Sequence, residues 1–202
     1  MILGIGGLVL LSQLRTTTAG NGKTRPASVL ILGDSHSEAS YALGGRLASE
    51  IEAAGIPVTL EGHRNRGVEW YLTSGTLASA LSDLPPDLAI VQLGGRDAVE
   101  VYEEMDYKEL LLAFVEQLRQ AGTNTIVWLS PTKHEGSTWS QTQRREIARW
   151  QAEYLPSLGV EVFDQYPVTL DLPTVDGVHY GPIQYQVWAE RLLADPLAWV
   201  IA

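Results

Sequence analysis

Two short polar clusters in this sequence hold the residue types of a serine nucleophile and its base. The first, GDSHS at 33–37, ends an apolar run, and the second, DGVH at 176–179, lies near the C-terminal end. A serine hydroxyl becomes a useful nucleophile when a nearby base takes its proton. A carboxylate three residues before a histidine, in a turn with glycine, can fix the tautomer of the imidazole. The pattern therefore allows Ser35 as nucleophile, His179 as base and Asp176 as orienting acid.

Each cluster also has a plain structural interpretation. Asp34 or Ser35 could cap a helix that follows a strand, and the second cluster could be a loop that caps the next helix. His36 is adjacent to Ser35 in sequence, so its side chain is expected to project elsewhere. The order of the surrounding elements decides between the two interpretations.

Strand and helix patterns alternate along the chain from residue 28. Short apolar segments bounded by glycine, proline and polar residues predict strands at 28–33, 57–63, 88–94, 124–131 and 159–164. Apolar residues at helical spacing predict helices at 38–54, 70–82, 106–120, 140–155 and 181–194. The alternation predicts an α/β fold, a three-layer α/β/α sandwich with a central five-stranded parallel sheet.

The ends of the predicted strands carry polar segments. Ligands bind beyond the carboxyl ends of the strands in open parallel sheets. Ser35 follows the first strand, and the segments at 63–67, 94–98 and 130–136 follow the next three. His179 comes after the last strand. We therefore expect these segments to meet around Ser35, which favours the chemical interpretation.

The motifs GDSHS at 33–37 and DGVHY at 176–180 resemble those of the SGNH (GDSL-type) hydrolases, a family of α/β esterases, lipases and carbohydrate deacetylases. The resemblance covers about residues 28–195 and implies the flavodoxin-like fold of that family. It also implies a Ser35–His179–Asp176 triad that works through an acyl-enzyme. The oxyanion hole would use the backbone N–H groups of Ser35 and Gly67, the latter within NRGV at 65–68. GDSH stands here in place of GDSL, a variant associated with SGNH domains that act on cell-envelope polysaccharides.

The block after the third predicted strand departs from the family's pattern. The family has G-x-N-D, whose asparagine donates a third hydrogen bond to the oxyanion, whereas GGRD at 94–97 places Arg96 there. Loss of one such donor costs about 2.7–4 kcal/mol of transition-state stabilisation. Arg96 could still donate, could point outward to hold an anionic substrate group, or could mark a site that has lost activity. Asn65 could supply the missing donor.

The expected substrate is a small acyl ester, above all an acetyl ester, on a glycan. The sequence has no extended apolar insertion that could form a lid over a long acyl chain. The expected substrate-lining residues are Asn65, Trp70 and His134, although Trp70 could equally pack in the core at the start of a helix. Acyl transfer to another alcohol would use the same triad.

Two further classes of function stay open. A binding or structural protein of an envelope or a virion could keep the fold without turnover, which would explain Arg96 and the apolar N-terminal segment. A flavodoxin-like binder of a nucleotide or small molecule would hold a cofactor beside an unreactive Ser35. The esterase needs no cofactor, and no metal site is predicted because the histidines lack ligand spacing.

Composition excludes several classes of partner and chemistry. The net charge of −10 argues against nucleic-acid binding, which needs a basic surface. The chain has no cysteine, so it has neither thiol catalysis nor disulfides.

The N-terminal part of the chain is expected to lie apart from the catalytic domain. Residues 1–27 are interpreted as an apolar segment and linker, and 28–202 as the domain. Residues 2–14 are apolar and glycine-rich but too short to span a bilayer comfortably, so they could dock the chain to a membrane or a protein, or serve in targeting. We expect an extracytoplasmic, envelope-associated or virion location over a cytoplasmic one.

Overall fold

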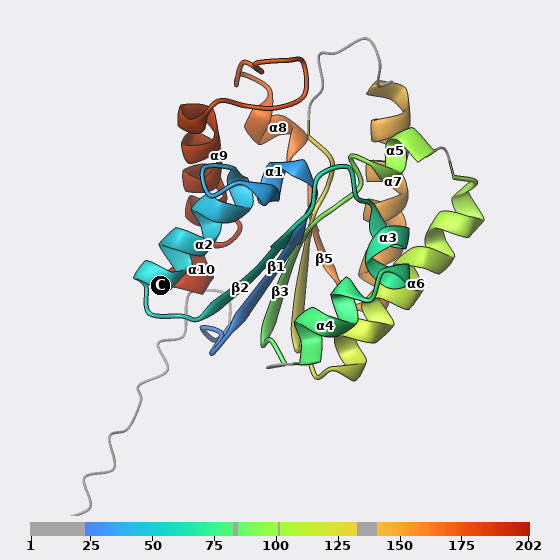
Figure 1. Ribbon diagram of the computed structural model, residues 1–202, viewed down its shortest axis with the longest axis horizontal. Coiled ribbons are helices and arrows are strands. Elements are labelled where there is room, and N and C mark those ends of the chain that lie inside the picture. Colours follow the sequence, from blue (N-terminus) through green and yellow to red (C-terminus); the bar gives the residue numbers. More distant parts are fainter. Residues whose placement is uncertain (1–22, 83–84, 101, 133–140) are drawn as a thin grey trace, which may run out of the picture.

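The computed structural model describes residues 23–82, 85–100, 102–132 and 141–202 (Figure 1). Its centre is a five-stranded parallel sheet in the order β2-β1-β3-β4-β5. The strands are β1 (Val29–Gly33), β2 (Val58–Gly62), β3 (Leu88–Gln92), β4 (Thr125–Leu129) and β5 (Glu161–Phe163). All the predicted strands are therefore present, and the order places β1 in the interior of the sheet.

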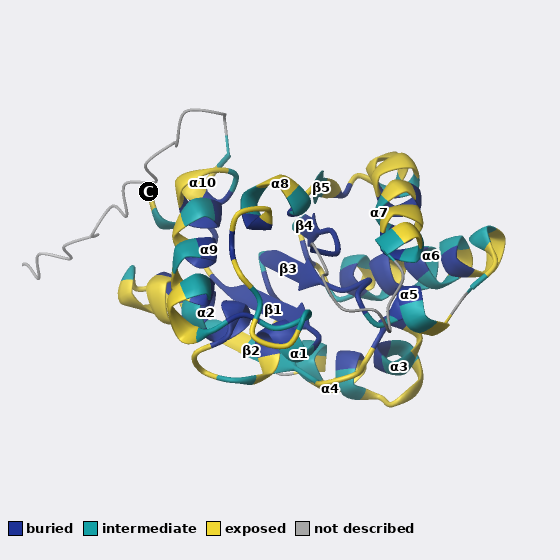
Figure 2. Cartoon of the chain, turned by 90° about the horizontal axis from the view of Figure 1, so that it is seen from above, coloured by how far each residue is buried: buried dark blue, intermediate teal, exposed yellow. Residues whose placement is uncertain are grey.

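Helices cover both faces of the sheet (Figures 1 and 2). One face carries α2 (Leu43–Ala53), α9 (Pro182–Ala194) and α10 (Ala198–Ile201), and the other carries α3 (Val68–Thr73), α4 (Thr76–Ser82), α6 (Glu104–Gln120) and α7 (Gln141–Tyr154). Short helical segments complete the described chain: α1 (Ser35–Glu38), α5 (Asp97–Glu100), η1 (Leu155–Leu158) and α8 (Tyr166–Thr169). The predicted three-layer α/β/α sandwich is confirmed.

The buried strands serve two separate cores. In β1, Val29 and Ile31 join the core under α2 and α9, whereas Leu30 and Leu32 join the core under α3, α6 and α7. Successive side chains of a strand point to opposite faces, so a strand covered on both sides must be apolar throughout. This is why β1 reads as a continuous apolar run that stops only at the edge of the sheet.

Two predicted helices differ in the structure. The helix expected at 38–54 is α2, which begins only at Leu43, and the helix expected at 70–82 is divided into α3 and α4. Gly75 separates α3 from α4 with a φ of +81°, a left-handed conformation that suits glycine and ends a helix. The short segments α5, η1, α8 and α10 were not predicted, because single turns carry no measurable periodicity.

The described end of the N-terminal segment contacts the domain. Lys23 forms an ion pair with Glu161 and lies 4.8 Å from the ring centre of Trp199. Arg25 donates a hydrogen bond to the carbonyl oxygen of Ala54. Residues 1–22, and with them the docking segment predicted at 2–14, lie outside the described residues. Within the described ranges, no helix is both long enough and apolar enough to cross a membrane.

Candidate active site

Ser35 stands at the point where the interior strand β1 ends and α1 begins. A Cβ at Gly33 would lie 2.2 Å from the Ser37 hydroxyl oxygen, so the tight turn after the strand requires glycine there. Asp34 caps α1, since its side chain accepts a hydrogen bond of 2.9 Å from the backbone N–H of His36. Asp34 is buried and Ser35 is half-buried. The turn thus raises the serine hydroxyl above the carboxyl edge of the sheet.

The structure brings the three predicted triad residues together. His179 Nε2 lies 2.8 Å from Ser35 Oγ, and His179 Nδ1 lies 2.7 Å from Asp176 Oδ2. The serine and the histidine are 144 positions apart in sequence. With Nδ1 bound to the carboxylate, Nε2 is the nitrogen that can accept the serine proton. The arrangement is that of a nucleophile, a base and an orienting acid.

Asp176 is held by its own turn as well as by the imidazole. Its Oδ1 accepts hydrogen bonds from the backbone N–H groups of Val178, at 2.9 Å, and His179, at 2.7 Å. Gly177 makes the turn possible with a φ of +84°. Partial burial opposes ionisation of Asp176, but the hydrogen bonds from the His179 backbone and ring and from Val178 outweigh it and lower its pKa to about 2. Asp176 is therefore a carboxylate at neutral pH.

The loop that carries Asp176 and His179 is held by one hydrogen bond within it and by contacts of α9 with its start. The backbone N–H of Val175 donates to the carbonyl oxygen of His179 at 2.7 Å. Arg191 of α9 makes a two-pronged contact with Asp171, at 2.6 and 2.8 Å, and donates to the Val168 carbonyl oxygen at 2.6 Å. These contacts place a long connection against a packed helix.

Two pockets open beside Ser35 and His179. The smaller, about 50 Å³, is lined by Asp34, Ser35, His36, Asn65, Arg96, Arg144, Val178 and His179. The larger, about 280 Å³, is lined by Ser35, Glu38, Ala39, Tyr41, Ala42, Arg64, Val175, Asp176, His179, Tyr180 and Tyr185. Ser35 and His179 thus lie between a small polar recess and a wider groove.

Asn65 and Arg96 both line the small pocket. Asn65 adopts a left-handed backbone conformation with a φ of +57°, which asparagine tolerates better than most residues. Arg96 donates from Nε to Glu100 Oε1 at 2.9 Å, an exposed (i, i+4) pair. That contact uses one donor of the guanidinium and leaves the side chain at the pocket wall.

The remaining predicted site residues are Gly67, Trp70 and His134. Gly67 precedes α3 and faces the buried Asp97, where a Cβ would come within 2.7 Å of Asp97 Oδ1. Trp70 packs against His63, with ring centres 4.9 Å apart, and is not among the residues that line either pocket at Ser35. His134 falls in the segment 133–140, outside the described residues.

Arg144 is a site residue that the sequence interpretation missed. It comes from α7, is 3% exposed, lines the small pocket and donates to the Thr132 carbonyl oxygen at 3.2 Å. Burial raises the pKa of Asp34 to about 6, and the His36 N–H and the positive charge of Arg144 oppose that rise. One feature of the sequence could have indicated Arg144. The helix at 141–154 has few apolar residues, so the face that it buries must include polar side chains.

His36 lies behind the base instead of beside the nucleophile. Its ring centre is 5.5 Å from that of His179, and its Nδ1 lies 2.9 Å from the Tyr185 hydroxyl. It is buried among the aromatic rings of Tyr180, Tyr185 and Trp188. As expected from its position in the sequence, the His36 side chain does not point to the Ser35 hydroxyl. It packs against the ring of His179.

Comparison with known proteins agrees with this architecture. The model of the GDSL-like lipase/acylhydrolase family matches residues 17–187. The search of curated proteins found no match. Among solved structures, a carbohydrate acetylesterase from Sinorhizobium meliloti superimposes with a TM-score of 0.67 at 17% identity, covering 85% of this chain and 98% of its own.

Two further solved structures show the same fold. The aryl esterase of M. smegmatis gives a TM-score of 0.65 at 19% identity, covering 85% of this chain and 99% of that one. An acetylxylan esterase from Geobacillus stearothermophilus, solved as a catalytic mutant, gives 0.66 at 15% identity, covering 88% and 95%. Identities this low show the shared fold alone.

Proposed function

The chain belongs to the GDSL-like lipase/acylhydrolase family and is an SGNH-type serine ester hydrolase, and from this premise we propose that it removes small acyl groups, chiefly acetyl, from a glycan. One observation supports the proposal above all others. The hydrogen-bonded series Ser35 Oγ, His179 Nε2, His179 Nδ1 and Asp176 Oδ2 has distances of 2.8 and 2.7 Å. Few arrangements other than a nucleophile and its base account for that geometry at the carboxyl edge of a parallel sheet.

In the first half of the proposed reaction, His179 Nε2 takes the proton of Ser35 while Oγ attacks the ester carbonyl carbon. Asp176 remains ionised and stabilises the imidazolium that forms. The tetrahedral intermediate then collapses, the bond to the alcohol oxygen breaks, and His179 gives its proton to that oxygen. In the second half, His179 activates a water molecule that attacks the acyl carbon and releases the acid and Ser35.

The small pocket is where we place the negative charge of the tetrahedral intermediate. The backbone N–H of Ser35 is the first donor, and the family pattern adds the N–H of Gly67. Asn65 and Arg96, which line the pocket, supply donors in place of the family's asparagine. Preorganised donors of this kind act on charge that develops only in the transition state, so they lower the barrier more than they tighten substrate binding.

The sizes of the two pockets support a small acyl group and a bulky alcohol. A volume of about 50 Å³ is a few times the roughly 10–15 Å³ that one water molecule needs on the same measure, so the recess accommodates an acetyl group but no long acyl chain. The groove of about 280 Å³ on the other side of Ser35 carries Tyr41, Tyr185 and Arg64, which suit a sugar ring. The carbohydrate acetylesterase and the acetylxylan esterase that share the fold point in the same direction.

The test compares the full chain with its Ser35→Ala variant. We expect p-nitrophenyl acetate and acetylated xylo-oligosaccharides to release acetate, and the variant to lose activity by about a thousandfold or more. Circular dichroism of both proteins checks that the fold is unchanged. Equal turnover by the two proteins would contradict the role of Ser35. Failure of a fluorophosphonate to label Ser35 in the folded chain would favour a non-catalytic binding protein.

A further inference from the structure

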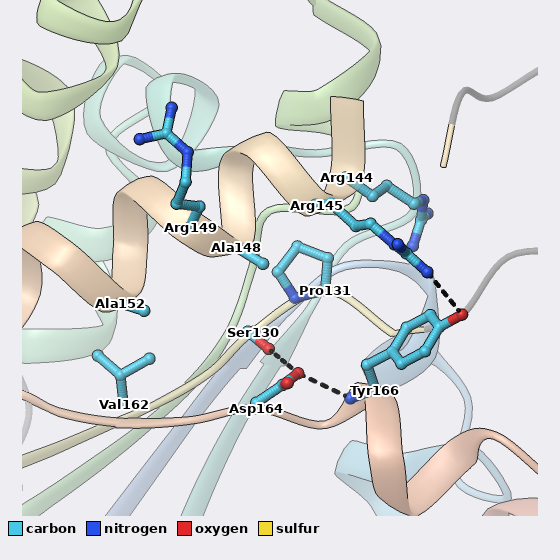
Figure 3. A pocket seen from close by; sticks show the side chains of 10 residues that line it. All are labelled: Ser130, Pro131, Arg144, Arg145, Ala148, Arg149, Ala152, Val162, Asp164 and Tyr166. Atoms are coloured by element: carbon cyan, nitrogen blue, oxygen red, sulfur yellow. Dashed lines mark hydrogen bonds between the residues drawn. The ribbon is translucent and has the colours of Figure 1, made fainter. Parts of the chain in front are cut away.

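A further cavity lies along the same edge of the sheet, and Ser35 is not among its lining residues (Figure 3). It has a volume of about 470 Å³, in the range of ligand pockets. Its walls come from the end of β4, from α7, from β5 and from the start of α8. The lining residues are Ser130, Pro131, Arg144, Arg145, Ala148, Arg149, Ala152, Val162, Asp164 and Tyr166.

The charge of this cavity is opposite to that of the molecule. Three arginines and one carboxylate line it, in a chain whose net charge is −10. The single carboxylate, Asp164, is already engaged: its Oδ1 accepts from the Ser130 hydroxyl at 3.2 Å and from the backbone N–H of Tyr166 at 2.9 Å. The cavity therefore has an excess of positive charge and of donors.

Arg145 is the arginine that can receive a ligand. Arg149 is compensated by Glu153, at 3.0 Å, and by Glu104, at 3.8 Å, and Figure 3 shows it pointing away from Tyr166. In the described part of the chain, the polar and ring contacts of Arg145 are with Tyr166: its Nη2 lies 3.2 Å from the hydroxyl, and its guanidinium carbon lies 5.2 Å from the ring centre. Among the described residues, no carboxylate pairs with Arg145. Its remaining donors, and the Tyr166 hydroxyl proton, are available to an anion.

Arg144 connects this cavity to the catalytic recess. Its side chain lines both the 470 Å³ cavity and the 50 Å³ pocket that contains Ser35. Arg145 follows it directly on α7, and Figure 3 shows both side chains at the same end of the cavity. The remaining wall is apolar, formed by Pro131, Ala148, Ala152 and Val162. Such a surface fits the C–H face of a sugar ring.

We propose that this cavity is a subsite for an anionic group, the carboxylate or phosphate of an acidic glycan, and that Arg145 is the residue that selects it. The inference rests on the proposed function, because it assigns the charge of the glycan whose ester Ser35 cleaves. A guanidinium presents paired N–H donors that match the oxygens of either anion. The Tyr166 hydroxyl provides a further donor, and the apolar wall packs against the ring.

Binding to the full chain tests the subsite without relying on turnover. The chain is titrated with three ligands in a calorimeter. Trigalacturonate tests binding of carboxylates, glucose 1-phosphate tests binding of phosphate, and neutral xylotriose measures the binding that needs no charge. We expect one of the anionic probes to bind more tightly than xylotriose, and Arg145→Gln to weaken it by about tenfold. Added salt should weaken the binding of the same probe, because it screens the attraction between the anion and Arg145. The probe that binds identifies the source of the anion.

A matched variant controls for general loss of charge. Lys108→Gln removes one positive charge on α6, from a half-buried pair with Glu104, and Lys108 is not among the residues that line the cavity, so this variant should leave binding unchanged. The subsite is ruled out if both anionic probes bind no better than xylotriose, or if Arg145→Gln and Lys108→Gln have equal effects.

Kinetics then separate this inference from the proposed function. Arg145→Gln should lower kcat/KM on an acetylated galacturonan or a phosphorylated glycan, yet leave p-nitrophenyl acetate hydrolysis within about twofold, since only the former needs the subsite. Loss on both substrates would mean a structural effect and would overturn the inference. If the chain fails to hydrolyse any ester, the proposed function fails, while the binding titrations still decide the anion subsite.

Discussion

At the scale of single residues, Asp176 determines the orientation of the proposed base, His179. Its two oxygens have different partners: Oδ1 holds the backbone of the turn and Oδ2 holds the His179 ring. The backbone contacts keep the carboxylate in place even when the ring moves. This division makes it possible to remove the charge without removing the turn.

The first prediction concerns Asp176→Asn. An asparagine can keep its oxygen on the backbone N–H groups of Val178 and His179, but its amide would then face Nδ1 and favour the wrong tautomer of the imidazole. We expect kcat/KM for p-nitrophenyl acetate to fall by about a thousandfold or more, with little loss of stability. Steady-state kinetics and urea unfolding of the two proteins measure the two effects. Activity within about tenfold of the parent would contradict an essential orienting acid.

The triad could be predicted from sequence because its members carry local signals. Ser35 follows an apolar run and Asp176 precedes His179 within one glycine turn, so strand order alone brings them to one edge. Arg144 and Arg145 had no such signal. Which face of α7 points to the sheet depends on packing against β4 and β5, and the sequence 141–154 has too few apolar residues to reveal that face. Trp70 was ambiguous for a related reason, since an aromatic ring at a helix start serves a core or a groove equally well.

At the scale of elements, the connection between α8 and α9 is what delivers the base to the nucleophile. It has little regular structure, so its conformation depends on its end contacts, chiefly those of Arg191 with Asp171 and with the Val168 carbonyl oxygen. Exposed ion pairs contribute about 0–1 kcal/mol to stability. The larger effect of these contacts is on the position of His179, because a small displacement of a base lowers the rate of proton transfer considerably.

The second prediction follows from that anchor. Arg191→Gln should lower the free energy of unfolding by less than about 1 kcal/mol and lower kcat by about threefold to tenfold, with KM changed less. The comparison variant is Lys108→Gln, which also loses an ion pair, a half-buried one with Glu104, but lies on α6, away from the loop. Urea unfolding and steady-state kinetics of both variants make the test. If the two variants lose activity equally, the anchor has no positioning role.

Element boundaries show where local sequence is insufficient. The strands were predicted to within two residues at each end because burial on both sides makes them apolar throughout. The late start of α2 was not foreseen, since apolar residues at 43, 47 and 51 keep helical spacing whether the helix begins at 38 or at 43. A glycine such as Gly75 interrupts a helix only when the chain needs a left-handed turn there, which is a tertiary requirement.

At the scale of the whole molecule, the active-site edge contains buried carboxylates that act on stability. Asp97 is fully buried and its Oδ1 accepts from the backbone N–H of Val68 at 2.9 Å. Burial raises its pKa to about 7, the Val68 N–H opposes that rise, and the negative charge of Glu100 adds to it. Burial likewise raises the pKa of Asp34, to about 6. Both carboxyl groups accept hydrogen bonds from backbone N–H groups, Asp34 from one in the turn at Ser35 and Asp97 from the one just after Gly67.

The last prediction is therefore that the folded chain becomes less stable as the pH rises from about 4 to about 7. Between a pKa near 4 in the unfolded chain and the folded pKa, about 6 for Asp34 and about 7 for Asp97, each buried carboxyl group still binds a proton that the unfolded chain has lost. Within its own window, each group lowers the free energy of unfolding by about 1 kcal/mol per pH unit. Asp176 acts in the opposite sense and only below about pH 4, because its folded pKa is depressed to about 2. Asp97→Asn keeps an oxygen that accepts from the Val68 N–H. Between pH 5 and 7, the free energy of unfolding of this variant should fall less steeply than that of the parent chain, by about 1 kcal/mol per pH unit. Urea unfolding at several pH values measures how steeply the free energy of unfolding changes with pH in the parent chain and in the variant. Identical slopes would mean that Asp97 is already ionised in the folded protein.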